Sequence, residues 1–211
     1  LPLAILLVGF DDARILATGL SLLTGLLVSF RYRKQIKRAK LLEILFVMAI
    51  GTACGLLLDR LLEAPFLITV YGIVTIGLAI AGFLPQKIFS GNLSRPVLVS
   101  ILFLAGIMQG LFVAGGAFLM VYAMHEFPDK TEFRATCSAV WGILNWFMLL
   151  NYALSGSINP VNLKLIALCS PVVLGVMFLA ELLQARINQT AFSKVTNSLL
   201  LVTGLVLLVS R

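Results

Sequence analysis

The chain has 211 residues, of which 60% are hydrophobic and only 12% are charged. A soluble domain of this size needs roughly a quarter of its residues charged to cover its surface, so the composition excludes an ordinary soluble fold. It predicts an all-α, polytopic membrane protein. The net charge of +7 does not indicate a nucleic-acid partner, because six of the sixteen cations lie in one loop, residues 31–40, between two apolar stretches. Such a loop is typical of the cytoplasmic side of a cell membrane.

The residues that catalysis or a cofactor would need are missing from the sequence. The three cysteines have no paired spacing, no glycine-rich phosphate loop is present, and the chain has a single histidine, His125. We therefore expect no enzyme activity, no cofactor and no metal site. His125 stands beside Glu126, where we expect an interfacial loop residue and not a proton carrier.

Six apolar windows are long enough for one membrane helix each, since about 20 apolar residues cross the hydrocarbon core. They cover residues 13–30, 41–58, 64–84, 133–153, 162–181 and 195–210. A further window, residues 97–124, has twenty-eight residues and is too long for one straight span. Because adjacent glycines weaken a helix, we expect a break at Gly115 and Gly116, with two half-helices forming a hairpin that returns to its starting side.

The hairpin gives the chain two inverted repeats, each with a broken helix hairpin and three transmembrane helices. It places twelve of the sixteen cations on the side of residues 31–40, against ten for a single crossing, so the positive-inside rule favours it. The predicted boundaries are residues 1–85 for the first repeat, 86–96 for a cytoplasmic linker and 97–211 for the second. Since the chain is apolar from Leu1, we expect the first hairpin arm to precede residue 1.

Several motifs resemble the TauE/SafE sulfite exporter family. In the second half these are Gly115–Leu119, Phe127–Lys130 and Glu132–Thr136, followed by Asn145; in the first half they are Ala17–Ser21 and the basic Arg31–Lys34. The resemblance implies a multi-pass exporter of small anions, such as sulfite, organosulfonates or related sulfur oxyanions. Two features depart from the family: Ala117 stands where proline is common, and the glycine-rich first hairpin is absent.

A polar stripe follows the predicted helix 133–153. Arg134, Ser138, Trp141 and Asn145 are separated by four, three and four residues, so they share one helix face. A guanidinium and an amide suit an oxyanion, because both present planar donors. The alternatives are that Arg134 only anchors the helix at the interface and that Asn145 only packs.

In the first half, Arg14, Thr18 and Ser21 repeat the spacing of four and three, although hydroxyls in membrane helices often bond to their own backbone. Gly115 and Gly116 would present backbone N–H groups at a half-helix amino terminus, where the helix dipole favours an anion; close helix packing is the alternative. The candidate substrate-binding residues are Thr18, Ser21, Gln109, Gly115, Gly116, Arg134, Thr136, Ser138 and Asn145.

These observations predict a secondary transporter of a small anion that works by alternating access in the lipid bilayer. The alternative is a non-transporting membrane scaffold, or an assembly partner of a sulfur-metabolism or redox enzyme. Which anion is carried, whether a proton is coupled, the direction of transport and the oligomeric state stay open.

Overall fold

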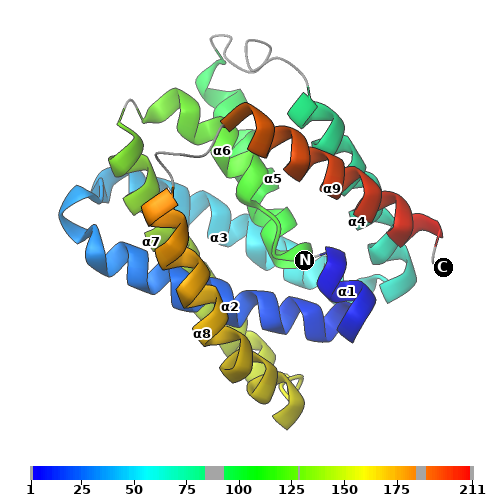
Figure 1. The fold of residues 1–211 in the computed structure, drawn as a ribbon. Helices are drawn as coiled ribbons and strands as arrows, with labels where there is room; N and C mark the ends of the chain where they lie inside the picture. Colours follow the sequence, from blue (N-terminus) through cyan, green and yellow to red (C-terminus); the bar gives the residue numbers. More distant parts are fainter. Residues whose placement is uncertain (1, 84–92, 128, 184–188, 210–211) are drawn as a thin grey trace.

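The computed structural model describes residues 2–83, 93–127, 129–183 and 189–209, and within these ranges the regular structure is entirely helical. Figure 1 shows the arrangement. The helices are α1 (Pro2–Val8), α2 (Phe10–Arg31), the short 3-10 helix η1 (Arg33–Gln35), α3 (Arg38–Leu61), α4 (Ala64–Phe83), α5 (Arg95–Phe112), α6 (Gly116–Glu126), α7 (Lys130–Leu154), α8 (Pro160–Leu183) and α9 (Gln189–Val209).

Six of the described helices are long and apolar enough to cross a membrane: α2, α3, α4, α5, α7 and α8. Large apolar side chains such as Phe46, Leu154 and Phe178 are mostly exposed, as expected where the surroundings are lipid and not water. The prediction of an all-α polytopic membrane protein is confirmed.

The break predicted in the long apolar window lies at residues 113–115, between α5 and α6. Val113 has the left-handed conformation, with φ 53° and ψ 33°, and its N–H closes the last turn of α5 by donating to the Gln109 carbonyl at 2.9 Å. A β-branched residue rarely adopts this conformation. The chain therefore turns at Val113 and resumes as a helix at Gly116.

The two arms of this hairpin end at the same end of the molecule. Arg95, at the start of α5, donates to Glu126, at the end of α6, over 2.6 Å. The same arginine pairs with Glu43 near the start of α3, and Lys40 pairs with both carboxylates. We call this end, with the loop 31–40, the basic end. The hairpin thus returns to its starting side, as predicted.

Close glycine contacts join the helices in pairs. α3 and α5 run parallel and touch backbone to backbone, and a Cβ atom on Gly55 would lie 2.5 Å from the Ile107 carbonyl oxygen. α2 and α7 run antiparallel and cross at Gly25 and Gly142. Small residues are common at such crossings, because lipid supplies no hydrophobic force and helices gain by close approach.

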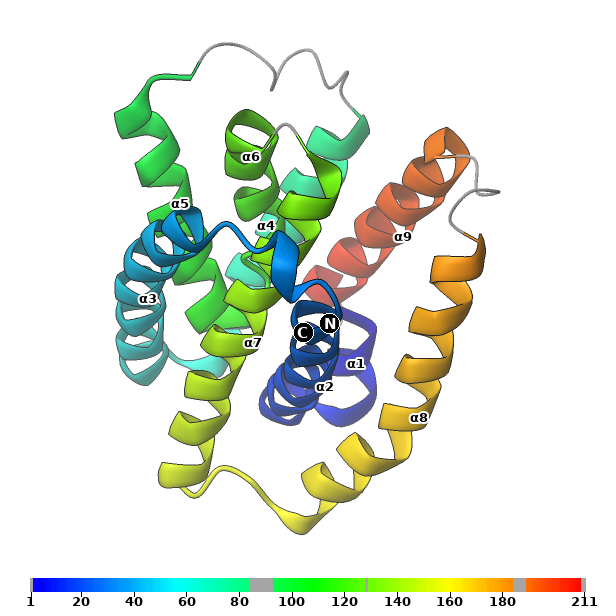
Figure 2. The ribbon, with the colours of Figure 1, turned by 90° about the vertical axis from the view of Figure 1, so that its left-hand side faces the viewer.

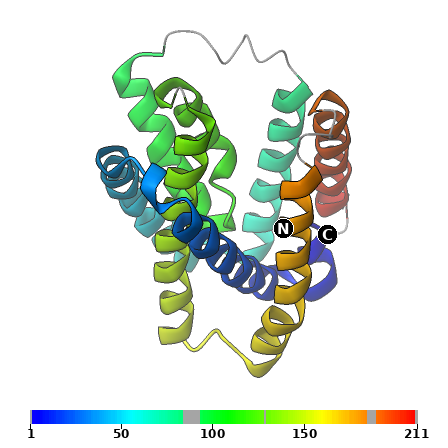
Figure 3. The ribbon, with the colours of Figure 1, turned by 60° about the vertical axis from the view of Figure 1, so that its left-hand side comes forward.

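Figures 2 and 3 show α3 and α5 on one side, α8 and α9 on the other, and α2 and α7 between them. α2 contacts α8, and α7 contacts α3. In the two repeats α2 is equivalent to α7 and α3 to α8, so these two contacts are equivalent. α4 and α9, which hold equivalent places in the two halves, pack on each other. This is the relation that inverted repeats produce. The repeat boundaries at 85 and 97 stay a prediction, since residues 84–92 lie outside the described part.

α7, the helix with the predicted polar stripe, has a defined start. The Asp129 carboxylate accepts the N–H groups of Thr131 at 2.6 Å and Glu132 at 3.0 Å, which caps the helix. The N–H of Glu132, and then that of Thr131, holds the pKa of the Asp129 carboxyl below its ordinary value.

Candidate transport cavity

A cavity of about 240 Å³ lies between α2, α7 and the hairpin break. None of the described residues that line it is charged, and several carry groups that form hydrogen bonds. The lining residues are Ser21, Thr24, Gly25 and Val28 from α2, Gln109, Val113 and Gly116 from the hairpin, and Ser138, Trp141 and Asn145 from α7. No group of three or more His, Cys, Asp or Glu side chains that could hold a metal occurs in the described part of the chain.

Three members of the predicted α7 stripe, Ser138, Trp141 and Asn145, line this cavity. Arg134 lies one turn nearer the basic end, where its guanidinium carbon is 5.3 Å from the centre of the Tyr32 ring, and it is not part of the lining. Thr136 is fully buried, and its hydroxyl accepts the backbone N–H of Lys37 at 3.1 Å. It therefore joins α7 to the connection before α3.

On α2, Ser21 lines the cavity and Thr18 does not. The Thr18 hydroxyl donates to the carbonyl of Arg14 in its own helix at 2.8 Å. Sequence reasoning missed Thr24, which lines the cavity and donates to the Leu20 carbonyl at 3.1 Å. Thr24 could have been predicted as a lining residue, because it is three residues after Ser21 and extends the same helix face.

Gln109 connects α7 to the hairpin break. It is 1% exposed; its Nε2 donates to Asn145 Oδ1 at 2.9 Å, and its Oε1 accepts the N–H of Gly115 at 3.3 Å. The Gly115 N–H is therefore already used. Gly115 is also packed tightly, since a Cβ atom there would lie 2.3 Å from the Ala105 carbonyl oxygen.

Gly116 has a different environment from its neighbour. It is the first residue of α6, it is exposed toward the cavity, and a Cβ atom there would have only Trp141 nearby, at 3.7 Å. The N-cap residue of α6 is Gly115, which has no side chain to cap the N–H groups of the first turn. The positive end of the α6 dipole therefore opens into the cavity.

The cavity extends from Ser21 and Asn145 toward the basic end, because Thr24 and Val28 follow Ser21 along α2 in that direction. In the opposite direction, Ile15, Met148 and Tyr152 pack together and are each buried. We call these three residues the Ile15 cluster. It separates the cavity from the other end of the molecule.

A buried ion-pair network, which sequence reasoning missed, lies at that other end. Arg14 is only 5% exposed; its Nη1 donates to Asp59 Oδ1 at 2.6 Å and to the Leu111 carbonyl at 3.0 Å, and its Nη2 donates to Asp11 Oδ1 at 2.6 Å. We call this end the Arg14 end. The sequence showed an arginine in the first turns of an apolar span, but nothing in it indicated which distant residues pair with that arginine.

Comparison with known proteins agrees with the motifs. The model of the family described as sulfite exporter TauE/SafE matches residues 1–207 of the chain. No curated protein and no solved structure matches. The family match covers the first predicted repeat, the second as far as residue 207, and all the residues that line the cavity.

Proposed function

This chain belongs to the sulfite exporter TauE/SafE family, which is a family of membrane transporters, and we propose that it exports a small oxyanion through the cavity between α2, α7 and the hairpin. Sulfite or an organosulfonate is the expected class of substrate. The observation that carries the proposal is an uncharged, donor-rich cavity at the amino terminus of a half-helix inside a membrane bundle.

The lining suits an anion with several oxygen atoms. Hydroxyls of Ser21 and Ser138 and the amide of Asn145 can donate to it, and the α6 dipole adds a positive potential at Gly116. No described lining residue is a carboxylate that would repel it. Neutral donors bind more weakly than a buried cation would, which helps a transporter release its substrate.

We assign the basic end to the cytoplasm, because most of the described cations lie there. The cavity then loads from the cytoplasm, while the Ile15 cluster and Arg14 close the opposite side. Export by alternating access requires the Arg14 end to open and the basic end to close.

Fluorescence of Trp141 tests the binding site. With Trp146, which is exposed, replaced by phenylalanine, Trp141 is the only tryptophan in the sequence. In lipid nanodiscs, titration with sulfite should change its emission in a saturable way. Sulfate, isethionate and acetate, titrated in parallel, define selectivity, and flux into liposomes shows transport.

The variant Gln109→Glu keeps the size of the side chain and places a negative charge in the lining. Repulsion of a unit charge at about 5 Å should weaken sulfite binding by about 100-fold or more. Gln35→Glu makes the same chemical change on the exposed η1 helix and should leave binding unchanged. Equal affinity in both variants, or no response and no flux from folded protein with any of the anions, would overturn the proposal.

A further inference from the structure

Arg14 is a buried cation inside a membrane helix, and such residues are costly and usually belong to a transport path. It joins three elements at the Arg14 end: α2, which carries it, α3 through Asp59, and the last turn of α5 through the Leu111 carbonyl. Phe10 covers one face of the guanidinium, 4.4 Å from its carbon to the ring centre. These contacts hold α2 against the α3–α5 pair.

Arg14 stands in line with the cavity. Along α2, Ser21 lines the cavity, Thr18 is fully buried and bonded to the Arg14 carbonyl, and Ile15 belongs to the Ile15 cluster. An anion leaving the cavity toward the Arg14 end must therefore pass between α2 and its neighbours, and there the bonds from Arg14 to Asp59 and to the Leu111 carbonyl tie α2 to α3 and α5.

The Arg14 guanidinium also has a donor group that forms no hydrogen bond within the described part of the chain. Arg14 Nε and the Tyr152 hydroxyl are buried and have no hydrogen-bond partner among the described residues. The adjacent Nη2 is held by Asp11, whose side chain is 71% exposed, and exposed ion pairs are weak. One edge of the guanidinium could thus exchange a carboxylate for another oxyanion, with two parallel N–H donors available to it.

Resting on the proposed function, we propose that Arg14 is the gate at this end: Asp59 and the Leu111 carbonyl hold it closed, and it binds the transported oxyanion when the gate opens. Opening separates α2 from α3 and α5, which deprives the guanidinium of Asp59 and the Leu111 carbonyl, while Asp11, on α2 itself, stays beside it. The oxyanion from the cavity supplies oxygen acceptors in their place. One anion replaces another at Arg14, so the charge around the guanidinium stays the same.

Thiol labelling tests both parts of this proposal. Ser21→Cys is the reporter, in a background in which Cys54, Cys137 and Cys169 are replaced by serine. Reconstituted protein is labelled from the Arg14 end with two methanethiosulfonates of similar size, one with a sulfonate group and one with a quaternary ammonium group. Labelling from the basic end serves as the control for folding.

Asp59→Asn should raise labelling from the Arg14 end by at least about tenfold, because the closed state loses a hydrogen bond between charged groups. The sulfonate reagent should gain more than the ammonium reagent, since Arg14 then lacks its counter-charge. In the double variant Arg14→Gln/Asp59→Asn the increase should persist and the preference for sulfonate should disappear. Glu63→Gln, which neutralises an exposed carboxylate just after α3, should leave the rates close to those of the parent.

Unchanged labelling in Asp59→Asn would overturn the gate, and an equal gain for the two reagents would overturn anion binding by Arg14. If the single variant does not fold, the double variant, which removes both buried charges together, decides on the gate. These rates do not depend on flux. Failure of the transport proposal would appear as absent sulfite binding with labelling intact, so the two failures are distinguishable.

Discussion

Gly115 and Gly116 are neighbours in the sequence with different roles in the structure. Gly115 packs against the backbone of α5 and gives its N–H to Gln109, whereas Gly116 begins α6 and faces the cavity. The first position needs a glycine for space. The second leaves room for a substrate beside Trp141.

Substitution by alanine should separate these roles. Gly115→Ala puts a methyl group 2.3 Å from the Ala105 carbonyl oxygen, so we expect a loss of about 1–3 kcal/mol in stability from overpacking. Gly116→Ala meets only Trp141, at 3.7 Å, and should keep the parent's stability while weakening sulfite binding several-fold. Thermal unfolding in detergent and Trp141 fluorescence measure the two effects. Equal melting temperatures for both variants would contradict this assignment.

The helical period explains how much of the site could be predicted. Ser138, Trp141 and Asn145 share a face because 3.6 residues make a turn, and all three line the cavity. The same period cannot say where along the helix a cavity ends, so it did not separate Arg134 from them. The importance of Arg14 depends on Asp59, forty-five residues away, and only the tertiary structure, in which α2 and α3 both pack on α7, brings them together.

At the scale of elements, the α3–α5 pair is the firmest support of the hairpin. Gly51 and Gly55 face Gly106 and Gly110, Thr52 donates to the Gly106 carbonyl at 3.2 Å, and the ion pairs of the basic end add to these contacts. This pair positions Gln109 and the break beside α7.

Two alanine substitutions can measure this contact. Gly55→Ala would bring a Cβ atom to 2.5 Å from the Ile107 carbonyl oxygen, and the backbones must then separate, at a cost of about 1–3 kcal/mol. Gly77→Ala, in α4, meets nothing within 4 Å and should be neutral or stabilising by up to about 1 kcal/mol, because alanine favours a helix. Melting temperatures in detergent compare them. A greater loss for the second variant than for the first would refute the packing argument.

The break itself could be predicted from the length of the apolar window and its two glycines, but its exact residue could not. The residue in the left-handed conformation is Val113. Conformational propensity alone would not have selected it, because β-branched residues rarely adopt this conformation. The long arm, α5, is eighteen residues, or about 27 Å at 1.5 Å per residue. The short arm, α6, has eleven, so the hairpin is unequal, as a break at Gly115 and Gly116 in the window 97–124 already implied.

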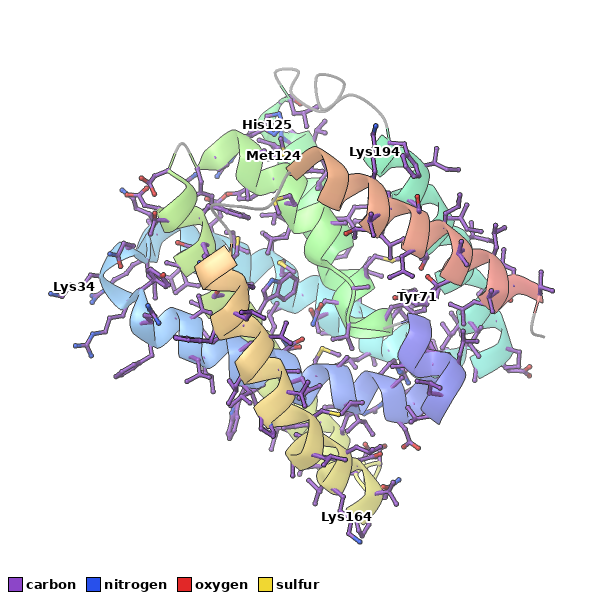
Figure 4. The ribbon with its side chains drawn as sticks, viewed as in Figure 1. Lys34, Tyr71, Met124, His125, Lys164 and Lys194 are labelled. Atoms are coloured by element: carbon purple, nitrogen blue, oxygen red, sulfur yellow. The ribbon has the colours of Figure 1, made fainter. Side chains whose placement is uncertain are left out.

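For the whole molecule, the hairpin decides which ends of the helices share a side. In Figure 4, His125 lies at the end of α6 near the top of the view and Lys164 at the opposite tip, at the start of α8. Lys34, in the basic loop, lies at the left edge of the view, away from Lys164 at the bottom. A single crossing in place of the hairpin would put Lys34 and His125 on opposite sides of the membrane.

Cysteine labelling with an impermeant reagent tests this topology. Without its native cysteines, the protein carrying Lys34→Cys or His125→Cys should react from the cytoplasmic side, and the protein carrying Lys164→Cys from the other side. Reaction of the Lys34→Cys and His125→Cys proteins from opposite sides would refute the hairpin topology. Labelling after the membrane is dissolved shows that all three positions are reactive.

The uncharged lining of the cavity has an energetic consequence for export. No described lining residue carries a charge, so no charged side chain of the cavity would move with the anion, and on the proposed function the anion carries its own charge across the membrane voltage. A potential of 100 mV, negative inside, is worth about 2.3 kcal/mol for each charge, or about a 50-fold concentration ratio. On the proposed function, a potential of this sign would drive a monovalent oxyanion outward, and collapsing it with an ionophore would reduce the flux.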